Sequence, residues 1–158
     1  MSDDPAATGL LIRTIQPADF EGWLPLWDGY NAFYGRIGAT ALAQEITKKT
    51  WERFFNPGEP VFALVAEDDG TIVGLAHYLF HRSTTRLGHV CYLQDLFTSP
   101  TQRNRGIGKA LINEVYKQAT QAQSSRVYWQ TQASNEIGRA LYDKVATHSG
   151  FLVYSHEL

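Results

Sequence analysis

The stretch TSPTQRNRGIGKAL at Thr98–Leu111 decides how the chain is organised, because a strand gives way to a helix there. It follows the apolar segment VCYLQDLF at residues 90–97 and leads into a helical pattern of apolar residues. A helix start presents unpaired backbone N–H groups and the positive end of the helix dipole, which attract anions. Gly106 and Gly108 leave room for a phosphate to approach the backbone, so the junction predicts a phosphate or pyrophosphate site. The local positive charge comes from Arg103, Arg105 and Lys109.

Two common nucleotide-binding motifs do not fit this loop. A P-loop ends in Gly-Lys followed by Ser or Thr, whereas Ala110 follows here and Arg103 occupies the first glycine position. The dinucleotide fingerprint requires a small residue where Leu111 stands, and it follows an early strand that this loop lacks. The loop by itself is also compatible with an ordinary turn into a helix whose arginines face solvent.

The segments around the junction predict one mixed α/β domain. Three consecutive strands form an antiparallel meander, and the later strand–helix–strand order favours a parallel pair. The fold class is therefore a mixed, mostly antiparallel sheet with helices on both faces. Residues 1–8 are predicted to be a flexible leader and residues 9–158 the single domain. The predicted strands are residues 10–15, 61–66, 72–80, 87–97, 126–131 and 151–155, and the predicted helices begin near residues 17, 41, 104 and 134.

Composition excludes several classes of function. The 158 residues are 44% apolar and 19% charged with a formal net charge of −2, as in a soluble globular protein. No basic stripe predicts nucleic-acid binding, and no apolar run predicts a membrane span. The single cysteine, Cys91, and an N-terminus without signal-peptide features favour a cytoplasmic location.

The loop RNRGIGKAL at residues 103–111 resembles the acyl-CoA pyrophosphate loop of the GCN5-related N-acetyltransferase (GNAT) superfamily. Arg103, Gly106 and Gly108 occupy the defining positions of that pattern, which is Gln or Arg, two residues, Gly, any residue, then Gly or Ala. SNEIGRALYDKV at residues 134–145 resembles the later helix of the family, and the order of elements resembles its fold over nearly the whole chain. The resemblance implies transfer of an acetyl group from acetyl-CoA to a primary amine by direct attack. More narrowly, CYLQDLFTSPTQRNRGIG and VYWQTQASN are similar to the branch of spermidine/spermine and small histone- or D-amino-acid-acetylating enzymes.

The resemblance also implies which residues bind the cofactor. Tyr142 lies where the family places a general acid beside the thioester sulfur, and Asn135 where it places a pantetheine contact. Helical spacing puts both on one face, opposite the stripe Ile137, Leu141 and Val145 that is expected to pack in the core. The implied cofactor-binding residues are the backbone of Leu96, Phe97 and Thr98, the loop Arg103, Asn104, Arg105, Gly106, Ile107, Gly108 and Lys109, and Asn135.

An acceptor amine has to lose a proton before it can attack. A lysine-like ammonium with a pKa of about 10.4 is neutral in only about one molecule in 2,500 at pH 7, which costs roughly 4.6 kcal/mol. Polyamine enzymes carry a glutamate where this chain has Gln94, which cannot serve as a base. Asp95 is the nearest carboxylate, although strand alternation turns it away from Gln94, and an anchoring role is the alternative. Glu67 and His89 are weaker candidates.

Aromatic residues of the first helix suggest where the amine binds. Trp23, Trp27, Tyr30 and Tyr34 recur at helical spacing, which is typical of packing on a sheet. In the family this region also borders the acceptor cleft, so Tyr30, Tyr34 and GRIG at residues 35–38 are expected to line it beside Gln94.

No metal site is predicted, because His77 and His81 lie about 13 Å apart on one strand and have no evident partners. The alternatives to a small-amine enzyme are a histone or other protein lysine acetyltransferase and a non-catalytic CoA-sensing module on the same fold. A homodimer is possible, since relatives often dimerise through the C-terminal strands.

Overall fold

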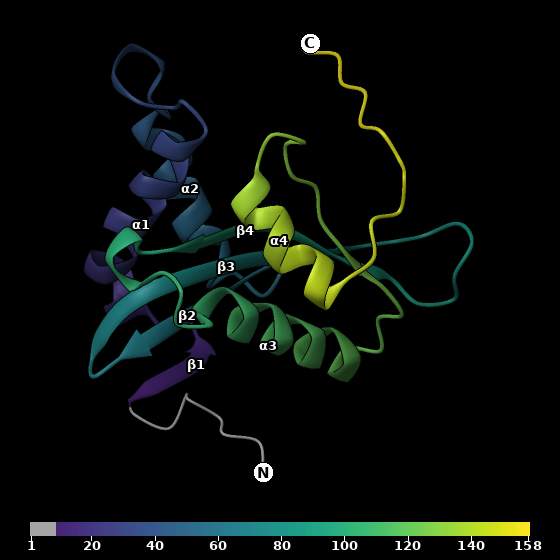
Figure 1. The fold of residues 1–158 in the computed structure, drawn as a ribbon, viewed down its shortest axis with the longest axis horizontal. Helices are drawn as coiled ribbons and strands as arrows, with labels where there is room; N and C mark the ends of the chain where they lie inside the picture. Colours follow the sequence, from purple (N-terminus) through teal and green to yellow (C-terminus); the bar gives the residue numbers. More distant parts are fainter. Residues whose placement is uncertain (1–8) are drawn as a thin grey trace.

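A five-stranded sheet in the order β1-β2-β3-β4-β5 runs through the centre of the computed structural model, which describes residues 9–158 (Figure 1). The first four strands are antiparallel to their neighbours, and β5 is parallel to β4. This confirms the predicted mixed, mostly antiparallel sheet; the predicted leader at residues 1–8 lies outside the described residues. The strands are β1 Leu10–Thr14, β2 Val61–Asp68, β3 Thr71–His81, β4 Val90–Thr98 and β5 Val127–Tyr128.

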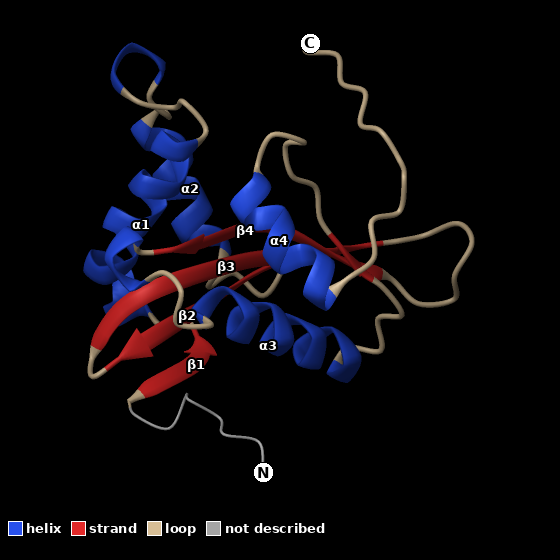
Figure 2. Ribbon diagram, viewed as in Figure 1, coloured by secondary structure: helices blue, strands red, loops and turns tan. Residues whose placement is uncertain are grey.

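Helices cover both faces of the sheet, as Figure 2 shows, and the buried side chains form two hydrophobic clusters. One face packs against α1 and α2, with Trp23 and Trp27 buried against Val65 and Leu75. The other face packs against α3 and α4. The predicted aromatic row of the first helix is therefore a core stripe. The helices are α1 Phe20–Phe33, α2 Gln44–Arg53, α3 Ile107–Gln121 and α4 Glu136–Val145, with short 3-10 turns at Pro17–Asp19, Gly38–Thr40 and Pro100–Gln102.

The hairpin between β2 and β3 turns at Asp69 and Gly70, which have φ angles of 47° and 83°. Positive φ at both central residues is the tight hairpin turn that an Asp-Gly pair favours. The predicted hairpin is confirmed.

One helix start and two strands differ from the prediction. α3 begins at Ile107 rather than near residue 104, because Asn104 and Gly106 have φ angles of 63° and 74° and cannot belong to a right-handed helix. The strand predicted at residues 126–131 is only two residues long. The strand predicted at residues 151–155 is not formed, because that exposed segment runs away from the sheet and pairs with no described strand (Figure 1).

A one-residue bulge in β4 places the site described below. His77 of β3 lies opposite Asp95, and the next residue, Tyr78, lies opposite Leu93, so Gln94 is the extra residue. Side chains before the bulge, such as that of Leu93, pack toward α3, whereas Phe97 after it packs toward α1. Odd-numbered side chains of β4 therefore face α3 before the bulge and α1 after it.

The bulge lies next to the point where β4 and β5 part. The two strands pair only at Cys91 with Val127 and at Tyr92 with Tyr128. Beyond Tyr92, β4 continues to Thr98 without a parallel partner among the described residues. The backbone edge of β4 is therefore open beside the start of α3.

Candidate active site

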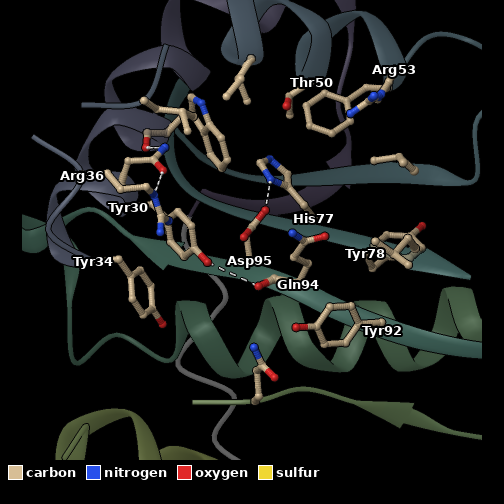
Figure 3. A pocket seen from close by; sticks show the side chains of 18 of the residues that line it. Tyr30, Tyr34, Arg36, Thr50, Arg53, His77, Tyr78, Tyr92, Gln94 and Asp95 are labelled. Carbon is tan, nitrogen blue, oxygen red and sulfur yellow. Dashed lines mark hydrogen bonds and ion pairs between the residues drawn. The ribbon is translucent and has the colours of Figure 1, made fainter. Parts of the chain in front are cut away.

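A cavity of about 740 Å³ opens between α1, α2 and the bulged part of β4. Tyr30, Tyr34, Gln94 and Asp95, which the sequence singled out separately, all line it, and Figure 3 shows their side chains together. Strand alternation predicted that Gln94 and Asp95 face opposite ways, but the bulge brings both to the cavity. Asp95 is buried, whereas Gln94 is exposed.

The Asp95 carboxylate belongs to a buried hydrogen-bonded chain. His77 Nδ1 lies 2.9 Å from Asp95 Oδ2, and Trp23 Nε1 donates to His77 Nε2 over 3.0 Å. The side chains of His77 and Asp95 are 4% and 10% exposed, so water has little access to their contact. His77 is a residue that the sequence reasoning considered only as a metal ligand. Its position opposite Asp95 depends on strand register, which no local pattern reveals.

Two tyrosines form the wall of the cavity next to Asp95. The Tyr30 hydroxyl donates to the backbone oxygen of Gln94 over 3.4 Å, and burial together with the nearby Asp95 carboxylate raises the pKa of Tyr30 well above its ordinary value. Burial and the charge of Asp95 also raise the pKa of Tyr34. The Arg36 guanidinium lies over the rings of Tyr30 and Tyr34, 5.8 Å and 5.5 Å from their centres. The wall is therefore aromatic, with a cation at its rim.

Tyr142 lies on α4, half-buried, with its ring edge-on to Trp129 at 5.5 Å. Burial, with a smaller contribution from Tyr34, raises the pKa of Tyr142, so its hydroxyl keeps its proton at neutral pH. Tyr142 is not among the residues that line the 740 Å³ cavity.

The stripe predicted to pack in the core on α4 is only partly right. Leu141 and Val145 pack against the core, but Ile137 is 81% exposed because the first turn of α4 extends past the apolar cluster. Tyr142, which lies on the predicted polar face, also packs against that cluster.

The loop before α3 has the conformation that an anion site needs. Gly106 has a φ of 74° and no atom within 4 Å of where a Cβ would lie, so the space beside its backbone is open. The first hydrogen bond within the helix runs from Ala110 N–H to Gly106 O, which leaves the N–H groups of Ile107, Gly108 and Lys109 for a ligand. The loop fits a pyrophosphate.

Two arginines and the second glycine around this loop make different contacts. Arg105 pairs with Asp68 at 2.8 Å and also contacts Gln102, whereas Arg103 lies exposed with its guanidinium 6.0 Å from the Phe97 ring centre. A Cβ on Gly108 would lie 3.1 Å from Leu141 Cδ2, so this glycine allows α3 and α4 to approach closely.

Asn135 has a structural role in this structure. Its Oδ1 accepts from Gly138 N–H over 3.2 Å and caps α4, and its Nδ2 donates to Thr131 Oγ1 over 2.9 Å. A Cβ on Gly138 would lie 2.4 Å from Asn135 Nδ2, so the cap requires a glycine there. The role of Asn135 toward pantetheine stays a prediction.

The weaker base candidates lie outside the 740 Å³ cavity. Glu67 pairs with Arg13 at 3.1 Å, and the ring of His89 lies 4.5 Å from that of Phe80. Within residues 9–158, no group of three or more His, Cys, Asp or Glu side chains is placed to hold a metal ion. In the same part of the chain, no helix combines the length and the apolar character needed to cross a membrane.

The sequence of this chain matches the profile of one enzyme family and two curated relatives. Residues 23–146 match the profile of the Acetyltransferase (GNAT) family. A D-amino-acid N-acetyltransferase of Saccharomyces cerevisiae, HPA3, is 32% identical over 147 residues, covering 92% of this chain and 89% of its own. The uncharacterized N-acetyltransferase YhfO of Bacillus subtilis is 27% identical over 145 residues, covering 90% and 94%.

Among solved structures, AAC(6')-Iy in complex with a CoA-containing bisubstrate analogue superposes with a TM-score of 0.79 at 17% identity, over 96% of this chain and 99% of that one. Aminoglycoside N-acetyltransferase AAC(6')-Iy has also been solved with CoA, and that structure superposes with a TM-score of 0.75 at 18% identity over 95% of both chains. At these identities the likeness shows the fold.

Proposed function

Because the chain belongs to the GNAT family and is an N-acetyltransferase, we propose that it transfers the acetyl group of acetyl-CoA to a primary amine held at Asp95. The observation that carries this proposal is the convergence on one cavity of a buried carboxylate, Asp95, and an aromatic wall, Tyr30 and Tyr34. A carboxylate attracts an ammonium, and aromatic faces stabilise the same cation.

The cofactor in this proposal is acetyl-CoA, which acetyltransferases of this family use. Its pyrophosphate would be held by the N–H groups at the start of α3 and by Arg103 and Lys109. The open backbone edge of Leu96, Phe97 and Thr98 would bind the pantetheine arm, next to Asn135. The support is the left-handed loop with open space at Gly106 and the unpaired end of β4.

The protein side of the reaction consists of proton transfers at two residues, Asp95 and Tyr142. When bound, acetyl-CoA supplies the thioester and the thiol leaving group. Asp95 takes one proton from the ammonium, which makes the nitrogen nucleophilic, and releases this proton to solvent through the cavity. Tyr142 donates its hydroxyl proton to the departing sulfur as the C–S bond breaks, and it regains a proton from the nitrogen after the C–N bond has formed. The products are the amide and the free CoA thiol.

The acceptor class we propose is a small amine such as an amino acid or a polyamine. The yeast relative's name states that it acts on D-amino acids. Arg36 and Arg53 line the same cavity as Asp95, so a zwitterion would find charges of both signs. The polyamine case has less support, because Gln94 replaces the glutamate of that branch.

The test is CoA-thiol release from acetyl-CoA across a panel of polyamines, D- and L-amino acids, histone-tail peptides and small alkylamines. Saturable turnover with a small amine supports the proposal. Selective turnover of the peptides would make the chain a protein lysine acetyltransferase. Acetyl-CoA binding without turnover on any acceptor would favour the non-catalytic CoA-sensing alternative.

A homodimer is also part of the proposal. The segment after α4 is extended and exposes large apolar side chains, including Phe151 at 84% and Tyr154 at 90%. Val153 of this segment borders the cavity, while β5 offers only two paired residues. We propose that a second copy of the chain covers this segment. Sedimentation analysis of the wild type against Phe151→Asp tests it: a wild-type dimer and a monomeric variant are expected, and a monomeric wild type would refute it. A cytoplasmic location stays a prediction that rests on the single cysteine.

A further inference from the structure

The hydrogen bonds around His77 have a fixed direction. An indole N–H can only donate, so the 3.0 Å contact from Trp23 Nε1 makes His77 Nε2 an acceptor. A neutral imidazole whose Nε2 accepts carries its proton on Nδ1, which therefore donates to Asp95 Oδ2 over 2.9 Å. Trp23 is 0% exposed, so water does not compete for this arrangement.

The directions of these two hydrogen bonds decide which group can accept a proton from the amine. His77 has no free lone pair, because the indole occupies Nε2 and Nδ1 already carries hydrogen. Asp95 is the sole carboxylate among the described residues that line the cavity, and only its Oδ2 is bound by His77. Its other oxygen is not engaged by His77 and can accept from an ammonium; Figure 3 shows Asp95 between His77 and Tyr30.

We propose that Trp23 and His77 are positioning residues: they hold the Asp95 carboxylate fully charged and oriented toward the acceptor ammonium. The proposal rests on the proposed function. A neutral imidazole N–H holds the carboxylate in place without cancelling its charge, whereas a protonated His77 would form a closed ion pair with it and weaken its hold on an ammonium. By occupying Nε2, Trp23 keeps His77 neutral.

The groups that surround the hydrogen-bonded Trp23–His77–Asp95 chain lie on or next to α1, α2, β3 and β4. The ring centre of Phe54, the residue after α2, lies 4.7 Å from that of His77, and the ring centre of Trp27 from α1 lies at 5.3 Å, so both contribute apolar contacts. The titratable and charged groups that line the same cavity are Tyr30 and Tyr34 at α1, Arg36 after it, Arg53 of α2, Tyr78 of β3 and Tyr92 and Asp95 of β4. These four tyrosines stay protonated because burial raises their pKa. The two arginines stay cationic at any pH used below.

The first test needs no substrate. Long-range ¹H–¹⁵N NMR spectra of the full ¹⁵N-labelled chain distinguish the two neutral imidazole forms and the cation for each of the five histidines. His77, assigned by its loss in a His77→Asn variant, is expected to show the Nδ1–H form from pH 6 to pH 8. An Nε2–H form or a protonated ring in that range would overturn the proposal.

The second test uses kinetics with the acceptor of the panel that is acetylated most efficiently. His77→Leu removes the donor to Asp95 and is expected to raise the amine KM at least tenfold while the acetyl-CoA Kd stays within twofold. His77→Asn supplies an amide N–H near the place of Nδ1 and is expected to recover most of this loss. Trp23→Phe frees Nε2, so its amine KM is expected to rise more steeply than that of the wild type between pH 8 and pH 6.

A merely structural role gives a different pattern. It would lower the melting temperature of His77→Leu while the amine KM and its pH dependence stayed at wild-type values, and that result would overturn the proposal. If the wild type acetylates no amine, the proposed function fails, and the NMR measurement still decides the state of His77. It also decides if His77→Leu or Trp23→Phe does not fold, since the assignment needs only His77→Asn.

Discussion

Replacing Tyr142 by phenylalanine removes one oxygen from the place where the thiol is expected to leave. Burial raises the pKa of the Tyr142 phenol above its ordinary value of 10.0, and a thiol has a pKa of about 8.5. With a cysteine thiol as the reference, full transfer of the proton from Tyr142 to the thiolate is therefore uphill by at least about 2 kcal/mol. Most of the rate increase that Tyr142 provides is therefore expected to come from a hydrogen bond to the sulfur as its negative charge develops.

A hydrogen bond to a charged group contributes about 1.5–3 kcal/mol. Tyr142→Phe is therefore expected to lower kcat by about 10- to 150-fold, with little change in acetyl-CoA affinity. Among the described residues the Tyr142 hydroxyl has no hydrogen-bond partner, so its removal is expected to change the free energy of unfolding by no more than about 0.5 kcal/mol. The assay is steady-state thiol release at saturating acetyl-CoA and amine.

Tyr116→Phe is the matched control. The Tyr116 hydroxyl donates to Val145 O over 2.8 Å at the end of the same helix, so its loss is expected to cost about 1 kcal/mol of stability and to leave kcat within twofold. A Tyr142→Phe variant with wild-type kcat would remove Tyr142 from the mechanism. An equal loss of kcat in both variants would indicate that α4 is merely displaced.

Three further predictions concern the loop, an ion pair and the thiol. Gly106→Glu is expected to weaken acetyl-CoA binding in calorimetry at least tenfold beyond Gly106→Ala, which carries only the left-handed strain of about 1–2 kcal/mol; equal affinities would refute the anion site. Arg13 lowers the pKa of Asp19, so the stability that Asp19 contributes is complete above its ordinary value of 3.8 and is lost as pH falls through the lower native value. Asp19→Asn is therefore expected to destabilise the fold by about 1.5–3 kcal/mol at pH 7 in urea titrations, with a smaller difference at pH 3, and a constant difference would contradict this. Burial raises the pKa of Cys91 to about 12, so Ellman's reagent at pH 8 is expected to label it only after unfolding, and rapid native labelling would show the burial to be wrong.

Features that depend on local sequence were predictable. The turn at Asp69-Gly70 and the helix start after Gly106 are set by residues that adopt positive φ angles, and both lie within a few positions of where the pattern puts them. The helical spacing of Trp23, Trp27 and Tyr30 likewise predicts one face, and that face is buried.

Features that depend on pairing between distant segments were not predictable. The sequence predicts a strand at residues 151–155 because its side chains are apolar, but a strand forms only where another strand offers its edge. His77 is 18 positions from Asp95, and only the register between β3 and β4 brings the two together. The Trp23 indole reaches the same ring from a helix 54 positions away.

The bulge at Gln94 links the two halves of the proposed site. If Gln94 instead paired with His77 in a regular ladder, strict alternation would turn Asp95 toward the side of α3, where Leu93 packs, and its contact with His77 would be lost. The bulge also bends β4 just past Tyr92, the last residue that pairs with β5, and so leaves the edge of Leu96 to Thr98 open. A single inserted residue thus places the carboxylate at the acceptor cavity and frees the backbone proposed to hold the cofactor. Because deletion of Gln94 would leave Leu93 opposite Tyr78 and Asp95 opposite His77, it is expected to straighten the edge of β4 and weaken acetyl-CoA binding in calorimetry while the His77–Asp95 contact is kept. Undiminished acetyl-CoA affinity in the deletion variant would contradict the role of the bulge.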